Sequence, residues 1–180
     1  MSATSADIRE LTRQLGRPVR GVVGIGARCV CGNPLVAITA PRLPDGTPFP
    51  TMFYLTHPAV VKAASQLEAR GEMQRYNEQL ADDPQLRAAY QRAHDDYLHR
   101  REKLGTVTEI AGISAGGMPT RVKCLHALIA HALAVGAGIN PIGDAALRCA
   151  ATEGLWQADR CECEHPRVAD DREIPPTLAQ

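Results

Sequence analysis

Apolar side chains near the N-terminus recur at the spacing of one helix face. The pattern covers residues 5–15, and Thr4 with Asp7 forms a capping box, an arrangement that opens many helices. We therefore expect a short amphipathic helix that ends at Gly16, two residues before Pro18.

Three apolar runs that follow have an extended pattern instead. They cover residues 21–29, 34–40 and 51–56 and are rich in β-branched and aromatic side chains, which strands favour. Gly32 and Asn33 join the first two runs and are typical of a tight turn. These two runs are therefore expected to pair as an antiparallel hairpin.

Helical spacing dominates the rest of the chain. Helices are expected to begin at Pro58 and Pro84, and apolar residues indicate further helices over 120–135 and 141–151. A few strands followed by several helices predict an α+β fold. It would pack a small N-terminal antiparallel sheet of about three strands with a helical C-terminal portion.

The length and composition fit a single folding unit with an extension. A chain of 180 residues favours one domain, which we place at residues 1–153. Residues 154–180 are polar, contain Cys and Pro, and are expected to form a tail.

The charge balance and the apolar run lengths narrow the class of protein. The chain has 20 basic and 20 acidic residues, which argues against a nucleic-acid partner because such binding needs a concentrated basic face. The first fifteen residues lack the apolar core of a secretory signal, and no apolar run is long enough to cross a bilayer. We therefore expect a cytoplasmic protein without membrane contact.

Six cysteines in a cytoplasmic protein need an explanation other than disulfides, because thiols stay reduced there. Metal ligation, a reactive thiol and core packing are the alternatives. Cys29 and Cys31 lie at the end of a predicted strand, where strand alternation would point their thiols apart unless the turn begins at Val30. His57 lies at a strand-to-helix junction, where it is either a ligand or a helix cap.

Cys124 falls in the first turn of a predicted helix, beside Arg121 and Lys123. The positive end of the helix dipole and the basic neighbours favour a thiolate, which both a metal and a nucleophilic mechanism require. On a regular helix Cys124 and His126 point about 200° apart, so they share an ion only if the helix begins after Cys124.

Two further groups of residues have candidate chemistry. Cys161 and Cys163 in the tail could complete a metal site, bind a metal alone, or be incidental residues of a disordered segment. Cys149 has no such neighbours and is assigned to the core.

A glycine-rich loop forms a candidate anion-binding site. Gly116 and Gly117 precede a helix that carries Arg121 and Lys123, and free backbone amides at a helix start attract phosphate or carboxylate. A flexible connector is the alternative interpretation.

Several motifs together resemble a bacterial domain of unknown function, family 501, in an actinobacterial style rich in Ala and Arg. The resemblance covers about residues 8–150. Its distinctive motifs are Leu15-Gly16-Arg17-Pro18, Arg28-Cys29, Cys31-Gly32-Asn33-Pro34, the proline-rich run 40–51, Tyr54-Leu55-Thr56-His57-Pro58, the loop 114–119, Arg121-Val122-Lys123-Cys124-Leu125-His126 and Asn140-Pro141-Ile142-Gly143-Asp144.

The resemblance implies no reaction, but it bears on the metal. Relatives often carry Cys where this sequence has His57, an exchange that a zinc ligand tolerates and an iron–sulfur cluster tolerates less readily. We therefore predict a zinc site at Cys29, His57 and Cys124. The fourth ligand is open among Cys31, His126, Cys161 and Cys163.

Three hypotheses of function follow. The first is a zinc-binding protein of unknown activity. The second is an enzyme that acts on a phosphorylated or carboxylated small molecule with Cys124 as nucleophile. The third is a non-catalytic adaptor whose helices over 58–104 meet a protein partner from cell division or central metabolism, a link suggested by genes that commonly neighbour those of the family.

Overall fold

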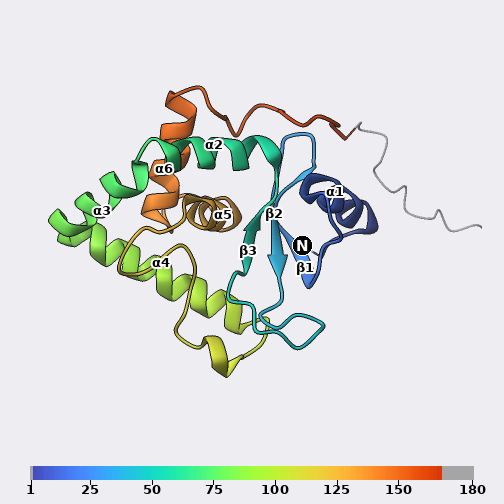
Figure 1. Ribbon diagram of the computed structural model, residues 1–180, viewed down its shortest axis with the longest axis horizontal. Coiled ribbons are helices and arrows are strands. Elements are labelled where there is room, and N and C mark those ends of the chain that lie inside the picture. Colours follow the sequence, from blue (N-terminus) through green and yellow to red (C-terminus); the bar gives the residue numbers. More distant parts are fainter. Residues whose placement is uncertain (1, 168–180) are drawn as a thin grey trace, which may run out of the picture.

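The computed structural model describes residues 2–167 of the chain. Its sheet has three antiparallel strands in chain order, β1 (Val22–Arg28), β2 (Pro34–Thr39) and β3 (Phe53–Leu55) (Figure 1). The predicted hairpin is therefore confirmed, and so is the α+β class with its small N-terminal sheet.

Within the described residues, the chain forms six α-helices. They are α1 (Ser5–Leu15), α2 (Pro58–Ala69), α3 (Glu72–Asp82), α4 (Pro84–Glu102), α5 (Leu125–Val135) and α6 (Pro141–Thr152). The capping box predicted for α1 is present, since the side chain of Thr4 accepts a hydrogen bond from the Asp7 amide. No helix in this part of the chain is both long and apolar enough to cross a membrane.

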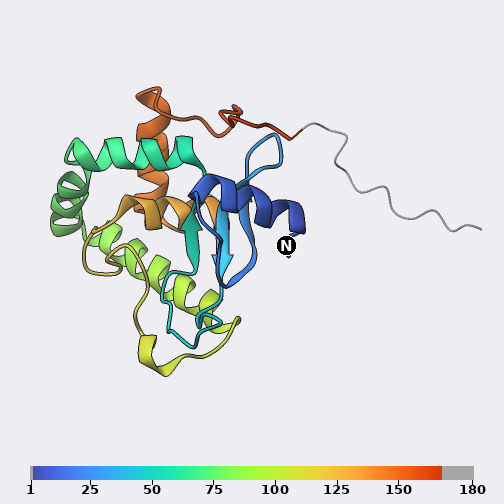
Figure 2. The ribbon, with the colours of Figure 1, turned by 45° about the vertical axis from the view of Figure 1, so that its right-hand side comes forward.

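The two faces of the sheet pack against different helices (Figure 2). On β2, Val36 belongs to the main core, which includes the apolar residues of α5, whereas the next residue, Ala37, packs with Leu11 of α1. Strand alternation explains this division, because successive side chains point to opposite faces. The α5 helix lies against all three strands and also against α2 and α6.

Close contact between α5 and α6 depends on one glycine. A Cβ added to Gly143 would lie 2.3 Å from the carbonyl oxygen of Leu128, which is closer than any real contact. Only a residue without a side chain therefore fits at this crossing.

Two helix assignments differ from the sequence-based expectation. The helix expected over 120–135 begins at Leu125, because the residues before it fold back on the glycine-rich loop. The Lys123 amide donates to the Gly116 carbonyl, seven residues earlier, instead of joining a helix. No element was assigned to residues 72–82, yet they form α3. Tyr76 and Leu80, four residues apart, bury one face of this helix.

Residues 154–167, called the strap below, return from α6 toward the hairpin turn (Figure 1). The Leu155 amide donates to the Ala150 carbonyl at 2.8 Å, and Trp156 is 3% exposed, so the strap begins packed against the domain. The strap is the described part of the predicted tail, and residues 168–180 lie outside the described residues.

Candidate metal centre

The turn between β1 and β2 brings the first two cysteines together. Strand β1 ends at Arg28, the Cys29 amide donates to the Asn33 carbonyl, and the Gly32 amide donates to the Cys29 carbonyl, both at 2.8 Å. Gly32 has φ 92°, a left-handed conformation that glycine adopts without strain. The chain thus leaves the extended conformation at Cys29, so strand alternation no longer separates this thiol from Cys31.

The strap brings two more cysteines to this turn. The sulfur atoms of Cys29, Cys31, Cys161 and Cys163 all lie within 4.8 Å of one another, and those of Cys31 and Cys163 are 3.4 Å apart. Four thiolates in a tetrahedron about a zinc ion, with bonds of about 2.3 Å, would be about 3.8 Å apart. The four free thiols are therefore spaced as ligands of one ion would be.

His57 faces the same group from the protein interior. It is the N-cap residue of α2, is 2% exposed, and its Nε2 lies 3.1 Å from the sulfur of Cys163. Its Nδ1 has no hydrogen-bond partner among the described residues. Burial lowers the pKa of His57 and keeps the ring neutral, the state in which imidazole binds a metal. The group of four mutually close sulfurs does not include His57, so its contact is with Cys163.

The thiols of this group resist ionising together. Burial raises the pKa of Cys29 and of Cys163. Burial acts in the same direction on Cys31, but backbone N–H groups of Asn33 and Arg167 donate to its sulfur and bring its pKa down to about 7. A divalent cation would supply the positive charge that the other thiols need, because a metal deprotonates a coordinating thiol outright.

A buried carboxylate anchors the strap to the turn. Asp7 is fully buried and accepts hydrogen bonds from Arg28 at 2.7 and 2.9 Å and from Arg167 at 2.6 Å. Arg167 also donates to the side chain of Asn33 at 3.0 Å, and Asn33 donates to the His165 carbonyl at 2.8 Å. Helix α1, the turn and the strap therefore share one network of charged hydrogen bonds beside the thiols.

The sequence of this domain matches a known family. A family model described as protein of unknown function (DUF501) matches residues 25–148, about two-thirds of the chain. The chain belongs to this family. The DUF501 match contains Cys29, Cys31 and His57 but ends before Cys161 and Cys163. Comparison with curated proteins and with solved structures gives no match.

Cys124 lies in a different group from Cys29. Its sulfur is within 4.8 Å of ligand atoms of His126 and Glu68. His57 is the N-cap residue of α2, and Glu68 lies near the other end of this helix. The eleven residues of rise between them place their backbones about 16 Å apart. The structure thus brings His57 beside one thiol group and Cys124 into a group near the opposite end of α2, and it does not unite the predicted set Cys29, His57 and Cys124.

Cys124 and His126 could share an ion only if the helix began after Cys124. It does, because α5 begins at Leu125 with Cys124 as its N-cap residue. Their side chains therefore meet despite their spacing. The hydrogen bond with Cys124, together with Glu68, raises the pKa of His126 to about 9, and the same hydrogen bond lowers the pKa of Cys124. The two shifts both favour a thiolate on Cys124 beside an imidazolium.

The predicted anion loop uses its own backbone donors. The Arg121 amide donates to the Gly117 carbonyl at 3.1 Å and the Lys123 amide to the Gly116 carbonyl at 2.7 Å, while both basic side chains are exposed. The first amide of α5 donates to the carboxylate of Glu68 at 2.7 Å, so a side chain already occupies the position of an anion. Anion binding here stays a prediction, and it would depend on the exposed side chains.

Sequence reasoning assigned the tail cysteines a secondary role and missed Glu68. The Cys-x-Cys spacing, which occurs both at 29–31 and at 161–163, could have indicated that the tail cysteines are ligands. No local signal pointed to Glu68, because its partners lie on a separate helix.

Proposed function

We propose that this protein binds one zinc ion through Cys29, Cys31, Cys161 and Cys163, and that the ion fastens the strap to the hairpin turn. The observation that carries the proposal is the meeting of two Cys-x-Cys pairs from opposite ends of the chain, with all four sulfurs within 4.8 Å of one another. Four protein ligands would close the coordination sphere, which is typical of structural zinc. The reduced thiols that the site needs fit a cytoplasmic location.

The spacing of the sulfurs favours a single ion over a cluster of metal atoms. Two sulfurs bound to the same ion at about 2.3 Å can be at most about 4.6 Å apart. This distance is close to the 4.8 Å within which all four sulfurs lie. A polynuclear iron–sulfur cluster distributes its four thiolates over several metal atoms. Tetrahedral sulfur ligation suits zinc, and His57 adds a neutral hydrogen-bonding partner for Cys163.

Elemental analysis tests this proposal. Protein purified anaerobically without chelators should contain about one zinc per chain, and Cys163→Ser should lose most of it. Cys149→Ser is the matched control, because Cys149 is a free thiol of α6 outside both groups. Absence of stoichiometric metal, or equal metal content in the two variants, would refute the proposal, and a coloured protein would indicate iron.

Nucleophilic catalysis by Cys124 is a second candidate function, which the hydrogen bonds of His126 favour. The Ser65 hydroxyl donates its single proton to the Val61 carbonyl at 3.0 Å, so it accepts a hydrogen bond from His126 Nε2 at 3.1 Å. His126 Nδ1 lies 3.1 Å from Glu68 Oε1, the same oxygen that accepts a hydrogen bond from the Leu125 amide. Both ring nitrogens then carry protons, and this imidazolium stabilises a thiolate on Cys124.

Alkylation by iodoacetamide tests this second candidate. The Cys124 thiolate would form a C–S bond and release iodide, and site-resolved mass spectrometry at pH 6.5 should show faster modification at Cys124 than at Cys149. His126→Gln should slow the reaction at Cys124 alone. Equal rates at the two cysteines, or no effect of the variant, would leave Cys124 an ordinary thiol.

A further inference from the structure

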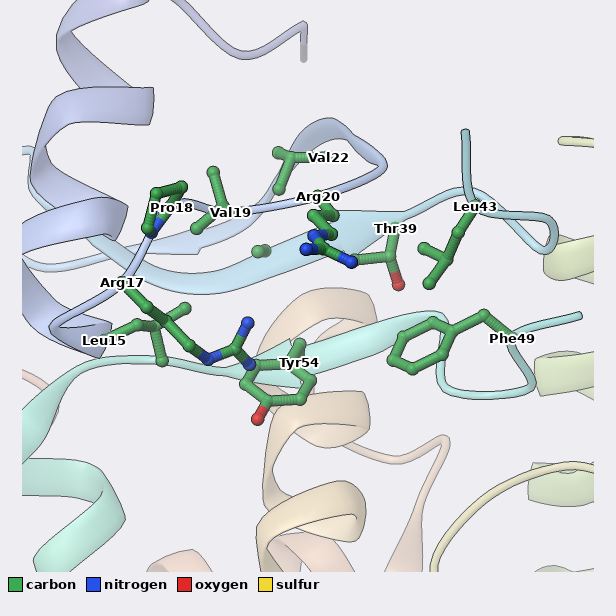
Figure 3. Close-up of a pocket in the computed structure, with 11 residues that line it drawn as sticks. Leu15, Arg17, Pro18, Val19, Arg20, Val22, Thr39, Leu43, Phe49 and Tyr54 are labelled. Atoms are coloured by element: carbon green, nitrogen blue, oxygen red, sulfur yellow. The ribbon is translucent and has the colours of Figure 1, made fainter. Parts of the chain in front are cut away.

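A cavity of about 350 Å³ opens on the face of the sheet that α1 covers only in part (Figure 3). Val22, Ala37, Thr39 and Tyr54 come to it from the three strands. The end of α1 and the segment that follows it contribute further side chains, as does the proline-rich loop over 41–50. These are Leu15, Arg17, Pro18, Val19, Arg20, Leu43 and Phe49.

The wall formed by the proline-rich loop is held by its own backbone. The Leu43 amide donates to the Thr47 carbonyl at 2.9 Å, and the Phe49 amide donates to the Pro41 carbonyl at 2.8 Å. Gly21, with φ 64°, lets Leu43 approach, since a Cβ there would lie 2.8 Å from its side chain. The cavity is therefore preformed, which reduces the entropy lost when a ligand binds.

The side chains that line the cavity are apolar except for two arginines and the hydroxyl-bearing Thr39 and Tyr54. In Figure 3 the rings of Phe49 and Tyr54 lie along one side, and the Arg17 side chain extends toward Tyr54. Within residues 2–167, no carboxylate lies within ion-pair distance of Arg17, and Arg20 has only a loose pair at 3.8 Å with the exposed Asp45. Among the residues that the structure describes, no acidic side chain lines the cavity.

We propose that this cavity binds a small apolar carboxylate, with a short acyl chain or single ring against the sheet and its carboxylate near Arg17. The volume lies at the lower end of the range for small-molecule sites, which excludes long lipid chains from full enclosure. Charge complementarity selects an anion, because the described lining offers two guanidinium groups and no carboxylate that competes for them. The site is separate from both thiol groups, so it does not depend on the proposed metal.

Nuclear magnetic resonance of labelled full-length protein can test the site with octanoate, octan-1-ol and inorganic phosphate. Octanoate should shift the amides of Val22, Thr39 and Tyr54 saturably, and the alcohol and phosphate should each bind at least roughly tenfold more weakly because each lacks one of the two features. Arg17→Glu should weaken octanoate binding by a similar factor.

Arg9→Glu is the matched control, because Arg9 is an exposed arginine of α1 outside the lining and the change in net charge is identical. It should leave octanoate binding within about twofold of the native protein, as a remote surface charge is screened at physiological salt. The absence of saturable shifts, shifts outside the cavity, equal binding of the alcohol, or equal effects of the two variants would each overturn the proposal.

Discussion

The network around Asp7 makes a quantitative prediction, because one fully buried carboxylate forms ion pairs with two arginines. Asp7→Asn keeps the shape of the side chain and removes its charge, leaving Arg28 and Arg167 without a counter-ion. Breaking a buried pair by removing one partner costs about 3–5 kcal/mol. The two arginine side chains are 24% and 25% exposed, so water recovers part of this loss, and we expect about 2–3 kcal/mol. The melting temperature should fall by roughly 4–12 °C in a domain of this size.

The dependence of this loss on pH provides a second check. Burial opposes ionisation of Asp7, but hydrogen bonds from Arg28, Thr4 and Arg167 hold its pKa well below the usual range. A lowered native pKa adds stability above the unfolded value of about 3.9, and that stability is lost as the pH falls toward the native pKa. The difference between native protein and Asp7→Asn should therefore be constant above about pH 5 and should shrink below pH 4.

Urea unfolding, followed by the fluorescence of the single tryptophan, Trp156, measures both effects. Glu109→Gln is the control, because Glu109 forms an ion pair with Arg42 in which both side chains are about half exposed, and its loss should leave the stability nearly unchanged. Both variants are compared in the same metal state. A similar cost for the two changes, or a cost at Asp7 that persists unchanged at pH 3, would show that its charge does not anchor the strap.

Four further substitutions test other parts of the core, each by urea unfolding. Tyr97→Phe should cost about 1–3 kcal/mol because it leaves a buried backbone amide without its acceptor, whereas Tyr76→Phe should cost nothing since the Tyr76 hydroxyl has no partner among the described residues. Gly143→Ala should destabilise by about 2 kcal/mol or more, although alanine is normally better in a helix by about 1 kcal/mol, because its Cβ would meet Leu128. Burial lowers the pKa of His131, so the unfolded chain takes up a proton first, and stability should fall as the pH drops below about 6.5. His131→Gln should show a flatter pH dependence over that window, and an unchanged slope would contradict this account.

Local patterns sufficed for most of the fold. The capping box, the turn at Gly32 and the apolar period of the strands each depend on residues close in sequence, and these elements form as expected. The predicted start of α5 is too early because residues 120–124 have helix-compatible composition, whereas their backbone bonds to Gly116 and Gly117 delay the start of the helix to Leu125.

The candidate site was only partly predictable, because its parts meet through tertiary contacts. Cys29 and Cys31 were identified from their own turn, and His57 from its junction. The structure does not group Cys124 with them, and the sequence does not show that Cys124 lies beside Glu68, near the end of α2 opposite to His57. The docking of Cys163 depends on Asp7 and Arg167, which are 160 positions apart.

The contact between Cys31 and Cys163 also brings together the two ends of a loop that contains most of the chain. These residues are 132 positions apart, and fixing such a loop in the unfolded chain would reduce its entropy by the equivalent of about 5 kcal/mol. During synthesis, the sheet and α5 leave the ribosome when only two of the four thiols of the proposed metal site have been made. The loop can close only after the strap emerges. Truncation just before Cys161 should therefore leave the folding of the sheet on the ribosome unchanged. The truncated chain would lack Cys163 and could not close the loop.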